Sequence, residues 1–217
     1  MSRRHKNRLV TDILTIITLI IFSGSILWIG GRPVIYLSKA YWNMAITKGA
    51  PTYLNKFNHN TTIFTQNKDK ENTSEIQVPN IGLHYGNIYC ERIGLEAPLY
   101  YGDKEEILLE GAGQHIASGL PGEGRTILIG GHDITYFAPL EQIEVDDIVE
   151  IETSYGKFQY QITSTVITHA QDDTAYDLTL EEEQLILYTC YPFGKVVGDR
   201  ERFFVYGHKI QNIAEDE

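Results

Sequence analysis

Residues 185–192 read Leu185-Ile186-Leu187-Tyr188-Thr189-Cys190-Tyr191-Pro192, and the architecture of the chain can be worked out from them. The run is apolar, too short for a solitary helix and rich in strand-forming residues, which predicts a buried β-strand. Pro192 cannot donate to a sheet, so the strand ends there. Cys190 is therefore carried to the end of a strand, where a thiol can face a substrate. A free cysteine also packs as a small buried apolar residue, so the rest of the chain has to separate the two interpretations.

The region after Pro79 is a succession of short strand patterns. Residues 87–93 alternate between apolar and polar, residues 126–131 are an apolar run that ends at His132, residues 158–166 have a period of two, and a last run covers residues 202–206. One short helical turn is predicted over Lys104–Leu109. Many short strands with few helices, and no regular alternation of strand and helix, predict a mainly β fold closed into a barrel.

The chain carries a net charge of −11, and its basic residues gather at one end. Arg3, Arg4, Lys6 and Arg8 lie in the first eight residues, so the remainder is more acidic still. Because nucleic-acid binding requires a cationic surface, DNA and RNA are excluded as partners. Two cysteines are too few for a disulfide scaffold.

The amino-terminal segment has the pattern of a membrane anchor. Residues 1–8 form a basic cytoplasmic tail, and residues 9–29 are apolar except for Asp12 and some Thr, Ser and Gly, which predicts a single transmembrane helix with the rest of the chain outside the cell. A cleaved signal peptide is the alternative, but no convincing cleavage site follows the apolar run. Residues 30–78 are predicted to be an interfacial segment and a solvated linker, and residues 79–217 to be the β-domain.

Three reactive side chains stand at predicted strand ends, namely His132, Cys190 and Arg202. A thiol attacks only as thiolate, and a neighbouring imidazole can take its proton. Attack on a carbonyl builds an oxyanion, which a permanently charged guanidinium stabilises. A nucleophile, a base and a fixed cation together indicate an acyl-transfer enzyme.

The same residues carry a resemblance to a known family. Residues 186–190 fit the sortase signature Thr-Leu-x-Thr-Cys with Ile186 in place of the first Thr, Gly131-His132 follows an apolar strand as in the Gly-His motif, and Arg202 opens the strand after the cysteine. Over about residues 79–210 the chain resembles the sortases, which are membrane-anchored cysteine transpeptidases of Gram-positive bacteria. The run Cys190-Tyr191-Pro192-Phe193 is most similar to class D, with class E close to it. Asp133 departs from the pattern, because many relatives carry Arg there.

The resemblance implies a sortase-type β-barrel of about eight strands with short helices, preceded by the transmembrane helix. Cys190 is then expected to attack the Thr–Gly bond of a Leu-Pro-x-Thr-Gly-like sorting signal, and the thioacyl group passes to an amine of a cell-wall precursor. His132 acts as acid and base, Arg202 steadies the oxyanion or the substrate, and Thr189 lines the substrate site. The protein is expected at the cell membrane with its catalytic domain outside, and no cofactor or metal is expected.

Other residues compete for these roles. His115, in a Gly-rich loop, is the rival base, and Arg200 lies on the same predicted strand face as Arg202. The acidic residues Asp172, Asp173, Asp177 and Glu181–Glu183 could bind calcium, which takes oxygen ligands, although a solvated acidic face is the preferred interpretation.

The competing class of function is a non-catalytic surface module. In that case Cys90 and Cys190 form a disulfide inside a β-domain that binds a wall component, which an oxidising environment permits. This hypothesis leaves the placement of His132 and Arg202 unexplained, and catalysis is therefore preferred.

Overall fold

The computed structural model describes residues 13–26, 31, 38, 41–42, 57–64, 75–195 and 201–210. The chain divides into two compact units, Met1–Trp42 and Asn43–Glu217. In the first unit residues 13–26 form a helix, which lies within the predicted span of residues 9–29; the remainder of that span is outside the described residues. No helix in the described part of the chain has the length and apolar character needed to cross a membrane.

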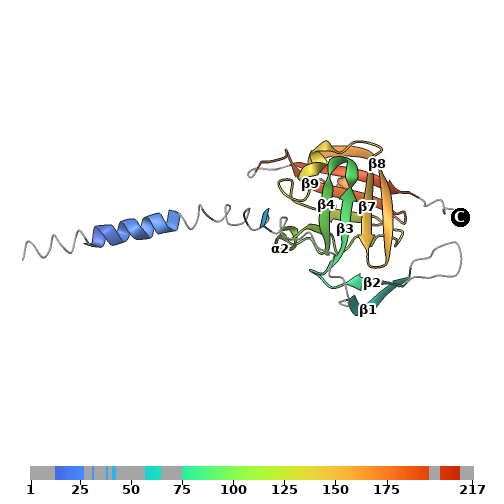
Figure 1. The fold of residues 1–217 in the computed structure, drawn as a ribbon, viewed down its shortest axis with the longest axis horizontal. Coiled ribbons are helices and arrows are strands. Elements are labelled where there is room, and N and C mark those ends of the chain that lie inside the picture. The colour runs from blue at the N-terminus through green and yellow to red at the C-terminus, as the bar shows by residue number, and fades with distance from the viewer. Residues whose placement is uncertain are drawn as a thin grey trace, which may run out of the picture. The chain divides into compact units, whose positions relative to one another are not determined.

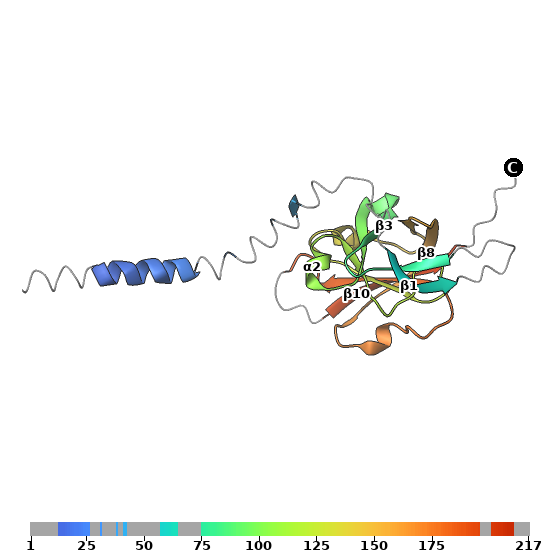
Figure 2. The same ribbon diagram turned by 90° about the horizontal axis from the view of Figure 1, so that it is seen from below.

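Eight strands of the second unit close into a barrel (Figures 1 and 2). They are β3 (His84–Cys90), β4 (Leu95–Tyr101), β5 (Ala112–Gln114), β6 (Ile127–Gly130), β7 (Ile148–Thr153), β8 (Gly156–His169), β9 (Gln184–Tyr191) and β10 (Glu201–Lys209). Around the barrel their order is β10-β8-β7-β3-β4-β5-β6-β9. The pairs β4–β5 and β6–β9 are parallel, whereas the other neighbours are antiparallel. The predicted mainly β barrel of about eight strands is confirmed.

Short helical turns connect the strands. They are η1 (Glu91–Ile93), α2 (Glu105–Leu108), η2 (Ala138–Gln142) and η3 (Asp173–Ala175). The turn predicted over Lys104–Leu109 is confirmed by α2, which links the parallel strands β4 and β5. The second parallel pair, β6 and β9, is joined through η2, β7, β8 and η3.

The central strand β9 is buried on both faces. Leu185 and Leu187 point into the barrel and belong to its core, whereas Ile186 packs on the outer face in a second apolar cluster with Leu128 and Phe204. Residues of the β8–β9 connection cover this second cluster, among them Tyr176. Burial on both sides explains why residues 185–187 are continuously apolar instead of alternating.

A separate two-stranded antiparallel sheet precedes the barrel. It pairs β1 (Phe57–Phe64) with β2 (Glu75–Pro79), in a stretch that the sequence placed in the linker. Ile76 of β2 is only 2% exposed and belongs to the barrel core. The packed part of the domain therefore begins before residue 79. The sequence gives little sign of this because residues 58–62 are polar and show no apolar alternation.

Candidate active site

The strands β9 and β10 bring Cys190 and Arg202 together, because the two residues are partners in the antiparallel register. Both are half-buried. Along β9 the side chains of Ile186, Tyr188 and Cys190 share one face, since successive residues of a strand alternate. Ile186 lies in the outer cluster, so Cys190 and Arg202 lie on the outer face of the barrel.

The parallel strand β6 carries His132 to the same place. Gly130 is the register partner of Tyr188, and the next residue, Gly131, donates its backbone N–H to the Tyr188 carbonyl at 3.2 Å. His132 follows Gly131 directly, so its backbone lies close to the carboxyl end of β9. A tight turn follows, in which the His132 carbonyl accepts the N–H of Phe137 at 3.0 Å. The backbone segments that carry the three predicted residues thus lie at neighbouring positions around the end of β9.

Two further hydrogen bonds tie the histidine segment to the cysteine segment. The Thr189 hydroxyl donates to the Gly131 carbonyl at 2.7 Å. The backbone N–H of Gly194 donates to the Asp133 carboxylate at 2.8 Å. These bonds involve the residues that immediately precede Cys190 and immediately follow His132. Both reactive side chains therefore sit on segments that are cross-linked on either side.

Thr189 and Asp133 differ from the sequence prediction. Thr189, expected to line the substrate site, is 1% exposed, because its position on β9 faces the barrel interior with Leu185 and Leu187. Asp133, given no role from the sequence, is buried and holds the loop after Cys190. Its departure from the Arg of the family pattern was the one sequence signal that could have drawn attention to it.

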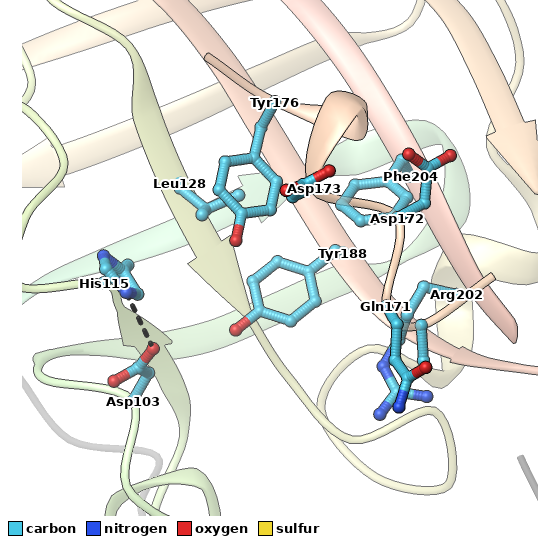
Figure 3. A pocket seen from close by; sticks show the side chains of 11 residues that line it. Asp103, His115, Leu128, Gln171, Asp172, Asp173, Tyr176, Tyr188, Arg202 and Phe204 are labelled. Atoms are coloured by element: carbon cyan, nitrogen blue, oxygen red, sulfur yellow. Dashed lines mark ion pairs between the residues drawn. The ribbon is translucent and has the colours of Figure 1, made fainter. Parts of the chain in front are cut away.

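A pocket of about 420 Å³ opens on this outer face (Figure 3). Leu128 of β6, Tyr188 of β9 and Phe204 of β10 come from the three adjacent strands, and Arg202 contributes at one side. The remaining lining residues are Asp103, His115, Ala170, Gln171, Asp172, Asp173 and Tyr176. The pocket combines apolar and aromatic surface with a few polar groups, as binding sites for small or extended ligands do.

The Tyr188 hydroxyl in the pocket interacts electrostatically with two of the predicted reactive residues. Burial, together with the charges of Asp103 and Cys190 and against the opposing effect of Arg202, raises the pKa of the Tyr188 hydroxyl to about 12. Cys190 and Arg202 thus both interact electrostatically with the Tyr188 hydroxyl, which stays protonated at ordinary pH. The pKa of the pocket residue Asp172 is lowered by the hydrogen bonds it accepts from Thr168 and Thr174.

The rival histidine His115 also lines the pocket, but its ring is otherwise engaged. Its Nδ1 accepts the backbone N–H of Ala117 at 3.2 Å, and its Nε2 lies 3.9 Å from the Asp103 carboxylate, as Figure 3 shows. For His132 the Nε2 lies 3.8 Å from the Glu105 carboxylate. Gly131, the residue before His132, is hydrogen-bonded to Tyr188 and Thr189, which precede Cys190 on β9. Arg200 lies outside the described residues, so its competition with Arg202 stays open.

The acidic residues of the β8–β9 connection have separate structural roles. Asp177 accepts the hydroxyl of Thr179 at 2.6 Å. Glu183 accepts the Tyr160 hydroxyl at 2.8 Å and the Lys209 ammonium at 3.0 Å. Within the described ranges no three His, Cys, Asp or Glu side chains are grouped as a metal site would require.

The two cysteines are free thiols in different surroundings. Cys90 is 1% exposed on β3, and burial, together with the charge of Asp147, raises the pKa of its thiol. A raised pKa makes a thiol a poor nucleophile near neutral pH. Cys190 is the more accessible of the two. The alternative of a Cys90–Cys190 disulfide is therefore wrong.

Comparison with known proteins identifies the family of this chain. The sortase domain profile matches residues 88–210. Sortase D of Bacillus subtilis (strain 168) is 33% identical over 132 residues, which cover 61% of this chain and 67% of that protein.

Solved structures share the barrel. The sortase D5 transpeptidase of Clostridium perfringens superposes with a TM-score of 0.54 at 24% identity, covering 61% of this chain and 82% of that one. A lid mutant of sortase A from Corynebacterium diphtheriae gives a TM-score of 0.54 at 24% identity over 61% of this chain and 73% of that one. At these identities the structural likeness shows the fold alone.

The closed barrel, with a cysteine at the end of one strand beside a pocket, is that of a cysteine transpeptidase. The chain belongs to the sortase family.

Proposed function

We propose that this protein cleaves a Leu-Pro-x-Thr-Gly-like sorting signal through a thioacyl intermediate on Cys190 and joins the released acyl group to an amine of the cell wall. The observation that carries the proposal is the pairing of Cys190 with Arg202 in the β9–β10 register. Arg202 also lines the pocket, and the residue before His132 is hydrogen-bonded to β9. A nucleophile, a base and a fixed cation are the groups that acyl transfer requires.

In the first half-reaction the Cys190 thiolate attacks the carbonyl carbon of the threonine in the Thr–Gly bond. The carbonyl oxygen becomes an oxyanion, which the Arg202 guanidinium stabilises by charge and hydrogen bonding. When the intermediate collapses, the C–N bond breaks and His132 gives a proton to the departing glycine nitrogen. The products are a thioester on Cys190 and a free amino-terminal glycine.

In the second half-reaction an amine of a cell-wall precursor attacks the thioester carbonyl. His132 takes the proton that the amine loses, and Cys190 departs as thiolate. The substrate is thereby joined through a new amide bond, and the enzyme returns to its starting state. No cofactor is needed for either step.

The pocket supports a peptide substrate. Its wall of Leu128, Tyr176, Tyr188 and Phe204 can bury apolar side chains of an extended segment, while Arg202 stands beside Cys190 at one side. Burial of an apolar side chain from water contributes about 1.5–3 kcal/mol, so each such side chain of the signal adds to its binding.

We further propose that residues 9–29 anchor the protein in the cell membrane with the catalytic domain outside. The support is the apolar composition of this span next to the four basic residues of positions 1–8. Deleting residues 1–29 should move the protein from the membrane fraction to the soluble or secreted fraction. A mature wild-type chain that begins after residue 40 would instead identify a cleaved signal peptide.

The deciding experiment for the catalytic proposal is the intact mass of the full-length protein, in mild detergent, after incubation with Leu-Pro-x-Thr-Gly-type peptides. Wild type is expected to gain the mass of the acyl fragment, and Cys190→Ala is expected to gain none. Cys90→Ala is the matched control and should still form the adduct. The proposal fails if wild type gains no fragment from any peptide of this type.

A further inference from the structure

Two phenol hydroxyl groups face the pocket. Tyr188 comes from β9 and Tyr176 follows η3, and Figure 3 shows both hydroxyls directed toward the same side of the pocket. Across the described residues neither hydroxyl makes a hydrogen bond to protein. Tyr206, on the same outer face, differs because its hydroxyl donates to the Ala175 carbonyl at 2.7 Å. The two pocket hydroxyls therefore remain able to donate to, or accept from, a bound molecule.

The Tyr188 ring is held in one position by its neighbours. It stacks on Phe204 with ring centroids 5.8 Å apart and planes at 27°. On its other side it lies over Gly130, where a Cβ atom would come within 2.6 Å of Tyr188 Cζ and 2.7 Å of its hydroxyl oxygen. A ring packed in this way loses little conformational entropy when its hydroxyl binds a ligand.

The position of Tyr188 relative to Cys190 determines what its hydroxyl can meet. The two residues share a face of β9 and are two positions apart, which is about 7 Å along a strand. An extended peptide advances about 3.3 Å per residue, so a peptide with its cleaved carbonyl at Cys190 passes Tyr188 about two residues away. Its main-chain amides would be desolvated against Leu128 and Phe204, and an amide without a partner there is destabilising.

We propose that the Tyr188 hydroxyl, with Tyr176 beside it, hydrogen-bonds a main-chain amide of the sorting signal about two residues from the cleaved bond and so positions that bond at Cys190. The inference rests on the proposed function and adds a substrate-binding residue to it. Because a hydroxyl can donate or accept, it suits either the N–H or the carbonyl of the peptide. Since burial keeps the Tyr188 hydroxyl protonated, this contact persists across the neutral pH range.

The test compares Tyr188→Phe and Tyr176→Phe with wild type in peptide cleavage by the full-length protein. Loss of one neutral hydrogen bond to the substrate should reduce kcat/KM by about 3- to 10-fold, mostly through a higher KM. The matched control is Tyr155→Phe, whose hydroxyl is buried, forms no hydrogen bond within the described residues and does not line the pocket. This control should keep the wild-type kcat/KM.

A second readout separates binding of the peptide from an effect on the thiol. Alkylation of Cys190 by iodoacetamide does not use the peptide contact, so Tyr188→Phe should be alkylated at the wild-type rate. A wild-type kcat/KM in Tyr188→Phe overturns this inference and leaves the proposed function standing. Slower alkylation of Tyr188→Phe also overturns it, because the hydroxyl would then act on Cys190. Absence of any thioacyl adduct on wild type is the different outcome that removes the proposed function itself.

Discussion

The Thr189 hydroxyl donates a hydrogen bond of 2.7 Å to the carbonyl of Gly131. These residues directly precede Cys190 and His132 in the chain, and the bond lies in the barrel interior, where Thr189 is 1% exposed. The bond therefore joins, inside the barrel, the two chain segments that carry Cys190 and His132. Thr189 is a positioning residue in this arrangement.

Replacing Thr189 by Val keeps the shape of the side chain and removes the donor. We expect the free energy of unfolding to fall by about 1–3 kcal/mol, because the buried Gly131 carbonyl loses its partner. We also expect kcat to fall with KM little changed, because the segments that carry His132 and Cys190 lose a hydrogen bond that joins them. Urea denaturation and peptide cleavage measure the two effects. Thr189→Ser, which keeps the hydroxyl, should retain most of the activity; equal losses in both variants would contradict the positioning role.

We expect Asp133 to contribute through the carboxylate oxygen that accepts the Gly194 N–H. Asp133→Ala leaves the Gly194 N–H without its partner and frees the loop after Cys190, so we expect lower kcat/KM and a loss of about 1.5–3 kcal/mol in stability. Asp133→Asn still offers a carbonyl oxygen and should lie close to wild type. Steady-state kinetics and thermal unfolding of the pair test this. If Asn is as damaging as Ala, the negative charge rather than the hydrogen bond is what matters.

Gly130 is required by the Tyr188 ring. A methyl group at this position would overlap the ring, so Gly130→Ala should destabilise the fold by about 1–3 kcal/mol and lower cleavage of the peptide. Combining it with Tyr188→Leu removes the overlapping ring atoms, and the penalty for the added methyl group should then shrink. A double-mutant cycle from denaturation curves measures the coupling. Simple additivity of the two substitutions would show that the ring does not lie over Gly130 in solution.

The strand ends that carry the reactive residues could be predicted because their signals are local. The apolar run before Cys190, the stop at Pro192 and the run before His132 each indicate a strand and its end. The resemblance to sortases then indicated that these residues act together in acyl transfer. Neither source required knowledge of which strands are neighbours.

The supporting contacts could not be predicted because they depend on pairing between distant segments. Asp133 meets Gly194, and Tyr188 covers Gly130, only after β6 and β9 lie side by side. Thr189 was misplaced for a related reason. With both faces of β9 buried, the apolar pattern does not tell which alternate positions face the interior and which face the site.

The choice between the two candidate histidines gives a further prediction. His132→Ala should lower kcat/KM by about 10²- to 10⁴-fold, because a general acid and base is lost. His115→Ala should lower it by less than about 10-fold, since the Nδ1 of His115 is engaged with the Ala117 backbone, whereas the residue before His132 is hydrogen-bonded to the residues that precede Cys190. Initial rates of peptide cleavage distinguish the two variants. The reverse order of effects would make His115 the base.

Arg92 and Asp147 give the fold a predictable response to acid. The Arg92 guanidinium donates to Asp147 at 2.6 Å, and the Glu144 backbone N–H donates to the same carboxylate at 2.8 Å. The hydrogen bond from Arg92 holds the pKa of Asp147 below its ordinary value, and the Glu144 N–H lowers it further against the opposing effect of burial. A depressed pKa stabilises the fold fully above the unfolded-state value of about 3.9, and that stabilisation is lost as pH falls through the folded-state pKa.

Asp147→Asn should therefore lower the Tm at pH 7 and do so progressively less as the pH is taken below about 4, where the wild-type carboxylate also becomes neutral. Thermal unfolding of wild type and variant at pH 7, 4 and 2.5 measures the difference. Arg92→Leu is the partner variant, and it should flatten the acid dependence in the same way, because it removes the largest cause of the depressed pKa. A Tm difference that stays constant from pH 7 to pH 2.5 would show that Asp147 contributes through its shape and not through its charge.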